Sequence, residues 1–103
     1  MKGNIYKTAV PKSGESFKQL FENRYISIEE IVSSDCSEDI LYDQPHDEAI
    51  FLLQGSATLW IEGEEVDMSA GDYLCIKARK RHRVLRCEKG TRWLAIHSKE
   101  PIC

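Results

Sequence analysis

Three side chains able to do chemistry lie close together near the middle of the sequence. Gln44, His46 and Glu48 stand two residues apart, and a second histidine, His82, follows in a later segment. In an extended backbone alternate side chains point to the same side, so the first three share a face if this stretch is a strand. Imidazole, carboxylate and amide groups are all donors to divalent metal ions. The question is which elements would bring His82 to this face.

The surrounding sequence predicts short strands separated by turns. Apolar and polar residues alternate over residues 25–32, and residues 48–54 form an apolar run that ends at Gly55. A turn at residues 62–64 joins segments 56–61 and 65–68, and another at residues 88–90 predicts a hairpin of segments 82–87 and 91–97. A strand at 73–76 follows the turn at 69–72. Before these, the spacing of Phe17, Leu20 and Phe21 predicts one or two helical turns. The pattern favours an all-β barrel or sandwich.

Two segments carry a resemblance to a known family. Residues 42–55 resemble the first motif of the cupin superfamily, in which a Glu stands seven residues before a Gly, as Glu48 and Gly55 do. Residues 71–82 keep the Gly and the His of the second motif, at Gly71 and His82. The chain is therefore similar to small single-domain, RmlC-like cupins. This implies a double-stranded β-helix, a jelly-roll-like barrel, and the spacing described above adds a short helical turn before it. We expect residues 1–24 to pack on a cupin barrel of residues 25–103.

The resemblance also implies a set of metal ligands, although the usual set is incomplete. Tyr42 and Gln44 stand where the first motif has its two histidines. Gln44, Glu48 and His82 remain at matching positions, and His46 is added on the same face. These four residues are the predicted ligands of a divalent ion, Zn, Fe, Ni or Mn. The alternative is that Glu48 and His82 form a buried hydrogen-bonded pair, Gln44 caps a loop and His46 is exposed.

The predicted function is binding of a divalent metal ion and a small organic ligand in the barrel, with no reaction assigned. Cupins include dioxygenases, isomerases and decarboxylases, so the resemblance implies a site and leaves open whether this chain is an enzyme. Tyr42 is a candidate proton donor at the site's mouth, and the alternative, which we favour, is a structural tyrosine of the core or rim. The alternative function is a metal-free module that binds a small molecule or an anion beside Lys77 and Arg79, which replace the Pro and Gly of the second motif.

Composition limits the other partners. The chain has 103 residues, 42% of them hydrophobic, and a net charge of -3, which fits one globular domain. Fifteen of 17 acidic residues lie between Glu15 and Asp72, and eight of 14 basic ones lie between Lys77 and Arg92. An acidic total and a basic run without interleaved aromatics argue against nucleic acid. We expect the two groups of charges to compensate one another across outward faces, leaving only Lys77 and Arg79 with a functional role.

Cellular location is predicted from two further features. No hydrophobic run resembles a signal peptide or could span a bilayer, so we expect no membrane partner. The four cysteines form no Cys-x-x-Cys pair, which favours reduced thiols in a cytoplasmic protein. We take Cys75 and Cys87 as apolar fillers and Cys103 as mobile.

Several predicted strands are apolar on both faces. Phe51 and Leu53 oppose Ile50 and Leu52, and Leu94 and Ile96 likewise oppose their neighbours. One face can fill the barrel and the other needs a cover, so we predict a homodimer. Cover by the amino-terminal segment, with Phe17, Leu20 and Phe21, is the alternative. His97, at the end of the last strand, is assigned a structural role.

Overall fold

Eight strands make up nearly all of the regular structure in the described part of the chain. The computed structural model describes residues 2–36 and 39–103. A 3-10 turn, η1 (Ile5–Lys7), precedes the strands. In chain order these are β1 (Glu15–Glu22), β2 (Ile26–Ser33), β3 (Asp47–Gln54), β4 (Ser56–Ile61), β5 (Glu64–Ser69), β6 (Tyr73–Ile76), β7 (His82–Cys87) and β8 (Thr91–Ser98). The all-β prediction is confirmed.

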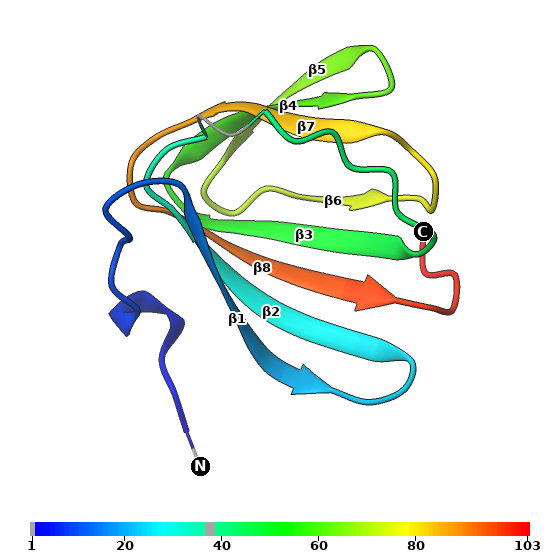
Figure 1. Ribbon diagram of the computed structural model, residues 1–103, viewed down its shortest axis with the longest axis horizontal. Coiled ribbons are helices and arrows are strands. Elements are labelled where there is room, and N and C mark those ends of the chain that lie inside the picture. Colours follow the sequence, from blue (N-terminus) through cyan, green and yellow to red (C-terminus); the bar gives the residue numbers. More distant parts are fainter. Residues whose placement is uncertain (1, 37–38) are drawn as a thin grey trace.

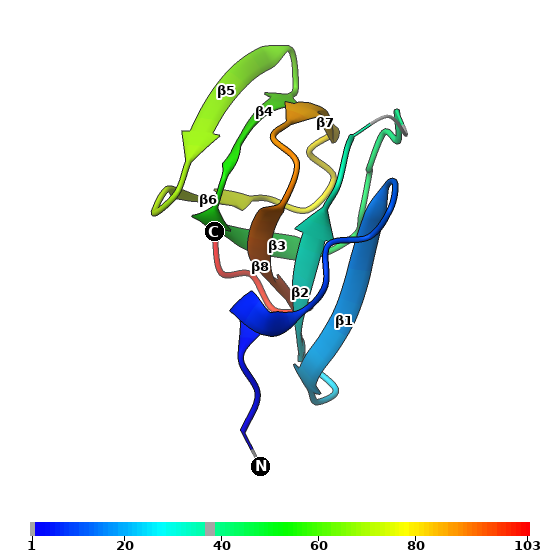
Figure 2. The same cartoon turned by 90° about the vertical axis from the view of Figure 1, so that its left-hand side faces the viewer.

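The strands form two antiparallel sheets that face each other (Figures 1 and 2). The five-stranded sheet has the order β1-β2-β8-β3-β6, and the three-stranded sheet has the order β5-β4-β7. Strand β8, the last in sequence, lies in the middle of the larger sheet between β2 and β3. This topology joins segments far apart in the chain, and the candidate site depends on it.

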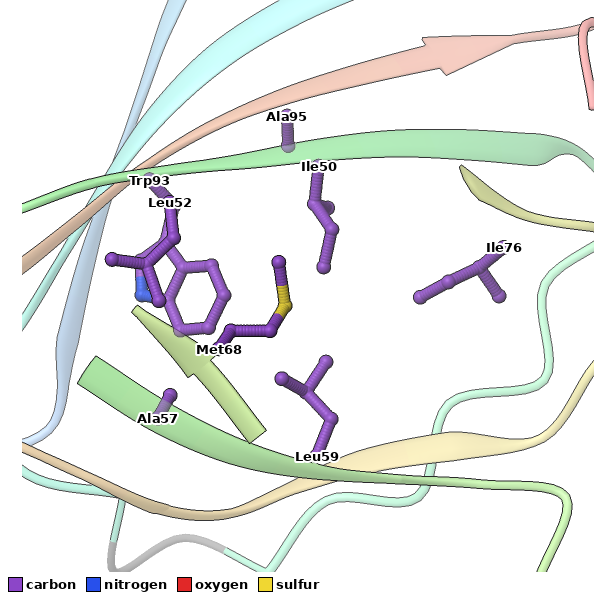
Figure 3. Close-up of a cluster of buried hydrophobic side chains, with 8 residues drawn as sticks. All are labelled: Ile50, Leu52, Ala57, Leu59, Met68, Ile76, Trp93 and Ala95. Atoms are coloured by element: carbon purple, nitrogen blue, oxygen red, sulfur yellow. The ribbon is translucent and has the colours of Figure 1, made fainter. Parts of the chain in front are cut away.

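The core fills the space between the sheets (Figure 3). The larger sheet contributes Leu52 and Ala95, both fully buried, and Trp93 at 4% exposure. The smaller sheet contributes Leu59 and Met68 from the opposite side. The even-numbered residues of β3 and the odd-numbered residues of β8 therefore face inward, as the strand period requires.

The turns agree with the sequence prediction in position but not always in pairing. Glu62 and Gly63, both at positive φ (44° and 92°), join β4 to β5 as a two-residue turn suited to a hairpin. The predicted hairpin of residues 82–87 and 91–97 is wrong, because β7 pairs with β4 while β8 pairs with β2 and β3. The turn at residues 88–90 instead carries the chain from one sheet to the other. Local sequence locates a turn but does not determine which strands pair.

The predicted helical turns at Phe17, Leu20 and Phe21 are also wrong, because these residues belong to β1. A β-bulge between Gln19 and Phe21 shifts the register, so that Phe17 pairs with Ile31 on the inner face and Phe21 with Ile28 on the outer face. The extra residue gives three apolar positions a spacing that imitates a helix. Pairing between β1 and β2 also continues the sheet across the division predicted at residue 24.

All four cysteines are in disulfides, contrary to the prediction of reduced thiols. Cys36 bonds to Cys87, and Cys75 bonds to Cys103, with Cα–Cα separations of 6.0 and 5.6 Å. The partners are 51 and 28 residues apart and belong to no local motif, so their pairing was not visible in the sequence. Cys75 and Cys87 are thus not simple apolar fillers, and Cys103 is tied down. Disulfides are rare in the cytoplasm, so the argument from free thiols for that location no longer holds.

No helix within the described residues is long and apolar enough to cross a membrane.

Ion pairs link the basic stretch to acidic residues elsewhere, as predicted. Arg81 lies 3.4 Å from Glu62, and Arg83 lies 3.1 Å from Asp39. Arg79 lies 3.5 Å from Asp43. These pairs are exposed and each adds little to stability. Because these arginines are paired with carboxylates, the basic stretch of residues 77–92 presents less of the unpaired positive charge that a polyanion site needs.

Gly55 is predicted to be far less replaceable than Gly71, although both have a left-handed backbone (φ 91° and 97°). A Cβ on Gly55 would lie 2.5 Å from Thr91 Oγ1 and 2.9 Å from Thr91 Cα, whereas one on Gly71 would meet nothing within 4 Å. We expect Gly71→Ala to cost about 1–2 kcal/mol through backbone strain alone. Gly55→Ala should cost about 2–5 kcal/mol because overpacking is added. Urea unfolding measures both, and equal losses would contradict the close approach of Thr91.

Candidate functional site

A cavity of about 100 Å³ lies between the two sheets, beside the core. Most of its wall is apolar and comes from both sheets, including Ile31, Ile50, Leu59, Ile76, Val84 and Trp93. Its polar lining includes Gln44, Glu48, His82, His97 and Glu29. An apolar cavity with a few convergent polar groups is the usual form of a small-molecule site.

Glu48 is at the centre of the polar groups. Its side chain is about nine-tenths buried, and its Oε1 accepts a 2.9 Å hydrogen bond from the Gln44 amide. The same Oε1 lies 3.7 Å from His82 Nε2, and Oε2 lies 3.8 Å from His97 Nε2. Burial alone would raise the pKa of Glu48, but its imidazole and amide neighbours hold that pKa below its ordinary value. Glu48 is therefore a buried carboxylate ion.

His82 is held by the loop that precedes it. Its Nδ1 lies 2.9 Å from the Lys80 carbonyl oxygen, which can only accept, so Nδ1 carries a proton. Its ring stacks on Tyr42 at a centroid distance of 5.5 Å. Nε2 is thereby turned toward Glu48. Burial alone would lower the pKa of His82, but the Glu48 carboxylate and the Lys80 carbonyl outweigh burial and raise that pKa.

His97 makes a second group of hydrogen bonds, one to a residue inside the barrel and one to a residue outside the cavity. His97 Nε2 lies 3.0 Å from Glu29 Oε1 inside the barrel, and His97 Nδ1 lies 2.8 Å from His46 Nε2. The bond to Glu29, opposed by burial, raises the pKa of His97. Burial and the nearby charge of His97 lower the pKa of His46. A charged His97 that donates to both neighbours, with His46 neutral, satisfies all three groups.

The structure brings together three of the four predicted ligands. Gln44, Glu48 and His82 line the cavity, but His46 does not. Residues 45–46 form a bend before β3 begins at Asp47, so the parity argument fails at His46. Its ring instead borders a hollow next to Tyr25 and Ile26. Tyr42 does line the cavity, as expected for a residue at its mouth.

Sequence reasoning missed His97 and Glu29. In the ladder, His97 lies directly opposite Glu48, which puts both side chains on the same inner face. Glu29 shares the inner face of β2 with Ile31, another cavity residue. The shared parity of His97 and Trp93 was a usable signal, but only together with the knowledge that β8 lies between β2 and β3.

Lys77 and Arg79, the predicted anion contacts, are exposed and do not line the cavity. Arg79 takes a left-handed backbone (φ 67°) at the position where the second cupin motif has Gly. Its backbone N–H donates to the Gln44 carbonyl at 2.7 Å. Arg79 therefore supports the site through its backbone, and the proposed anion site at these two side chains loses its geometric basis.

The donor chemistry of this cluster suits a metal ion, but the full ligand set is not assembled. Among the described residues, no group of three or more His, Cys, Asp or Glu side chains is arranged to hold a metal ion. His82 Nε2 and Glu48 Oε1 face each other across 3.7 Å, longer than a hydrogen bond, with the Gln44 amide alongside. One imidazole nitrogen, one carboxylate oxygen and one amide group fit a metal site of mixed ligands with open coordination positions.

The comparison with known families agrees with this architecture. The family model described as Cupin domain matches residues 34–97, more than half of the chain. The chain belongs to the cupin family. A crystal structure from Ralstonia eutropha JMP134, solved as a candidate mannose-6-phosphate isomerase, is 33% identical with a TM-score of 0.88, covering 97% of this chain and 99% of that one. An RmlC-like cupin from Shewanella frigidimarina NCIMB 400 is 16% identical with a TM-score of 0.78, covering 95% and 89%.

Among curated proteins, quercetin 2,3-dioxygenase of Bacillus subtilis (strain 168) is 34% identical to this cupin over 41 residues. That match covers 40% of this chain and only 12% of the dioxygenase. The proteins similar to this chain thus carry the names of two different enzymes.

Replacing His97 should destabilise the protein more than replacing His46. His97→Ala leaves the Glu29 carboxylate without its partner, and we expect a loss of about 1–3 kcal/mol near pH 6. Because the folded pKa of His97 is raised, its stabilisation is complete below about pH 6.5 and is lost as the pH rises through the folded value. The difference between wild type and His97→Ala should therefore shrink at alkaline pH.

His46→Ala is the matched control because it removes only the outer bond to His97. We expect a loss below about 1 kcal/mol, with the pH dependence retained. Urea unfolding from pH 5 to 9 measures all three proteins, and a pH-independent difference for His97→Ala would contradict a charged His97.

Proposed function

We propose that this cupin binds a divalent metal ion together with a small organic molecule in the barrel cavity. Gln44, Glu48 and His82 would hold the ion. When bound, it would act as a Lewis acid that polarises an oxygen of the organic ligand or a water. The observation that carries the proposal is the gap of 3.7 Å between His82 Nε2 and Glu48 Oε1, inside a buried site.

The space between His82 Nε2 and Glu48 Oε1 is a favourable place for a positive charge. The Lys80 carbonyl fixes a proton on Nδ1 of His82, so in the neutral ring the Nε2 lone pair points at a carboxylate. Two facing acceptors repel unless a proton or a cation lies between them. In metal sites a backbone carbonyl commonly accepts a hydrogen bond from the far nitrogen of a ligating histidine and so orients its ring. The Gln44 amide can present its oxygen by a simple rotation.

The cavity supports a small ligand of mixed character. Its volume of about 100 Å³ has room for only a few non-hydrogen atoms. Hydrophobic side chains of both sheets would cover the apolar part, and the Glu48 cluster would contact a hydroxyl, carbonyl or carboxylate. The named reactions of the similar cupins differ, so family membership assigns no reaction to this chain.

Metal content of the purified protein tests the proposal. We expect bound Zn, Fe, Ni or Mn in the wild type and a loss of most of it in His82→Ala and Glu48→Gln, because each removes one strong donor. His46→Ala is the control and should keep the metal, since its ring lies outside the cavity. A chelator should lower the melting temperature of the wild type but not that of His82→Ala or Glu48→Gln. Equal metal in all four proteins would remove the site.

A metal-free binding module is the second candidate, and one observation favours it. The Gln44 amide already donates to Glu48, and His97 already bonds to Glu29, so much of the polar cluster is satisfied without an ion. In that case a proton on His82 Nε2 would balance Glu48. A melting temperature that rises with a small hydroxy acid but is unaffected by chelator would support this alternative.

We also propose that the protein is a homodimer through the outer face of the five-stranded sheet. A row of directly opposed apolar residues crosses four of the five strands on this face, namely Phe21, Ile28, Ile96 and Ala49. A second row places Leu94, Phe51 and Tyr73 side by side. The amino-terminal segment contacts the neighbouring Glu30 and Arg92, through Thr8 and the Ile5 carbonyl, so it covers only part of this face.

Light scattering tests the dimer at micromolar concentration. We expect twice the chain mass for the wild type and a shift toward monomer for Phe21→Glu combined with Tyr73→Glu. Both side chains are more than 70% exposed, so the charges should not disturb the monomer's fold. Ile40→Glu, at an exposed loop position, is the control and should leave the mass unchanged. A wild-type monomer would end this part of the proposal.

A further inference from the structure

We propose that residues 99–103 form a latch that holds the loop of residues 77–81 in place, and that its state depends on the Cys75–Cys103 disulfide. Reduction of this bond would loosen the loop of residues 77–81, which holds two of the cavity's polar groups. The effect of the latch on ligand binding rests on the proposed function. Its effect on the loop of residues 77–81 does not, because hydrogen exchange of that loop can be measured with no ligand in the cavity.

The latch crosses the end of three strands. After β8 the chain turns back toward the start of β3 (Figure 1). The backbone N–H groups of Ile102 and Cys103 donate to Asp47 Oδ2 at 2.8 and 3.0 Å. The disulfide then ties Cys103 to Cys75 on β6. Residues 99–103 thus connect β8, the start of β3 and β6, which are neighbours in the larger sheet.

Asp47 connects the latch to the loop. Its other oxygen, Oδ1, accepts a 2.8 Å hydrogen bond from the Ala78 backbone N–H. The next residue, Arg79, donates to the Gln44 carbonyl at 2.7 Å. The residue after that, Lys80, offers its carbonyl to His82 Nδ1. One buried carboxylate therefore holds the latch on one side and the loop that positions Gln44 and His82 on the other.

The two disulfides differ in access to solvent. Cys75 and Cys103 are both exposed, whereas Cys36 and Cys87 are half-buried. An exposed disulfide is attacked more readily by a thiolate, and exposed bonds are typical of labile or regulatory disulfides. Reduction by a dithiol breaks the S–S bond, adds two electrons and two protons to give two cysteine thiols, and converts the reductant into a disulfide.

Loss of the covalent bond leaves the latch held by the hydrogen bonds from Ile102 and Cys103 to Asp47 and, at its start, by the hydrogen bond from the Lys99 N–H to the Tyr25 carbonyl. Residues 102–103, then held to Asp47 by two backbone hydrogen bonds, would open by local unfolding. Each opening removes two of the three hydrogen bonds that fix the Asp47 carboxylate, so Ala78 and Arg79 lose protection. By linkage, a ligand that orders Gln44 and His82 would in turn favour the closed latch.

Hydrogen exchange tests the latch in Cys36→Ser/Cys87→Ser, which keeps only the Cys75–Cys103 bond. We expect reduction with dithiothreitol to speed exchange of the Ala78 and Arg79 amides by about tenfold. Val66, on β5, serves as the internal control and should not change. The matched variant Cys75→Ser/Cys103→Ser should show the fast rates with or without reductant. Unchanged rates after mass spectrometry has confirmed reduction would overturn the latch.

Wild-type protein provides the same measurement if the double variant does not fold. Mild dithiothreitol followed by alkylation identifies which pair is reduced, and exchange is compared at that stage. Titration with Zn²⁺ separates the two proposals. Zn²⁺ binding that weakens on reduction supports control of the site, and equal affinity in both states contradicts it. Absence of Zn²⁺ binding in the oxidised protein contradicts the proposed metal site, while the exchange rates still decide the latch.

Discussion

The polar part of this cupin depends on one buried charge, the carboxylate of Glu48. Removing an ion from water costs several kcal/mol unless partners replace its hydration. Three elements that are distant in sequence supply those partners: the segment before β3 provides Gln44, the start of β7 provides His82, and β8 provides His97. The carboxylate is therefore stabilised only when the barrel has brought these three elements together, because each supplies one partner.

The backbone around the site supports these partners more than additional side chains do. Tyr42 exchanges two backbone hydrogen bonds with His82, and the Arg79 N–H holds the Gln44 carbonyl. A left-handed residue is needed at position 79, and the chain uses Arg there at a cost of about 1–2 kcal/mol compared with Gly. Loop 77–81 is therefore defined by its hydrogen bonds and not by an intrinsically favourable turn sequence.

Local pattern was sufficient for seven of the eight strands and for two of the three residues, Gln44, His46 and Glu48, that it predicted to face the cavity. It failed wherever the outcome depended on register or on distant partners. The bulge in β1 made a strand resemble a helix, and the bend at residues 45–46 turned His46 away from the cavity. His97 entered the site because β8 lies opposite β3, and the disulfides join segments separated by 28 and 51 residues. None of these facts is encoded within a short window of sequence.

Alternation along β3 gives two adjacent acids opposite tasks. Asp47 faces outward, where it accepts from Ile102, Cys103 and Ala78, and these backbone bonds hold its pKa below the ordinary value. Glu48 faces inward and organises the cavity. The two side chains rotate independently, so only a movement of the β3 backbone would carry a change at Asp47 to Glu48. The bonds from Ala78 to Asp47 and from Gln44 to Glu48 hold this part of the backbone from the outer and the inner face of the sheet.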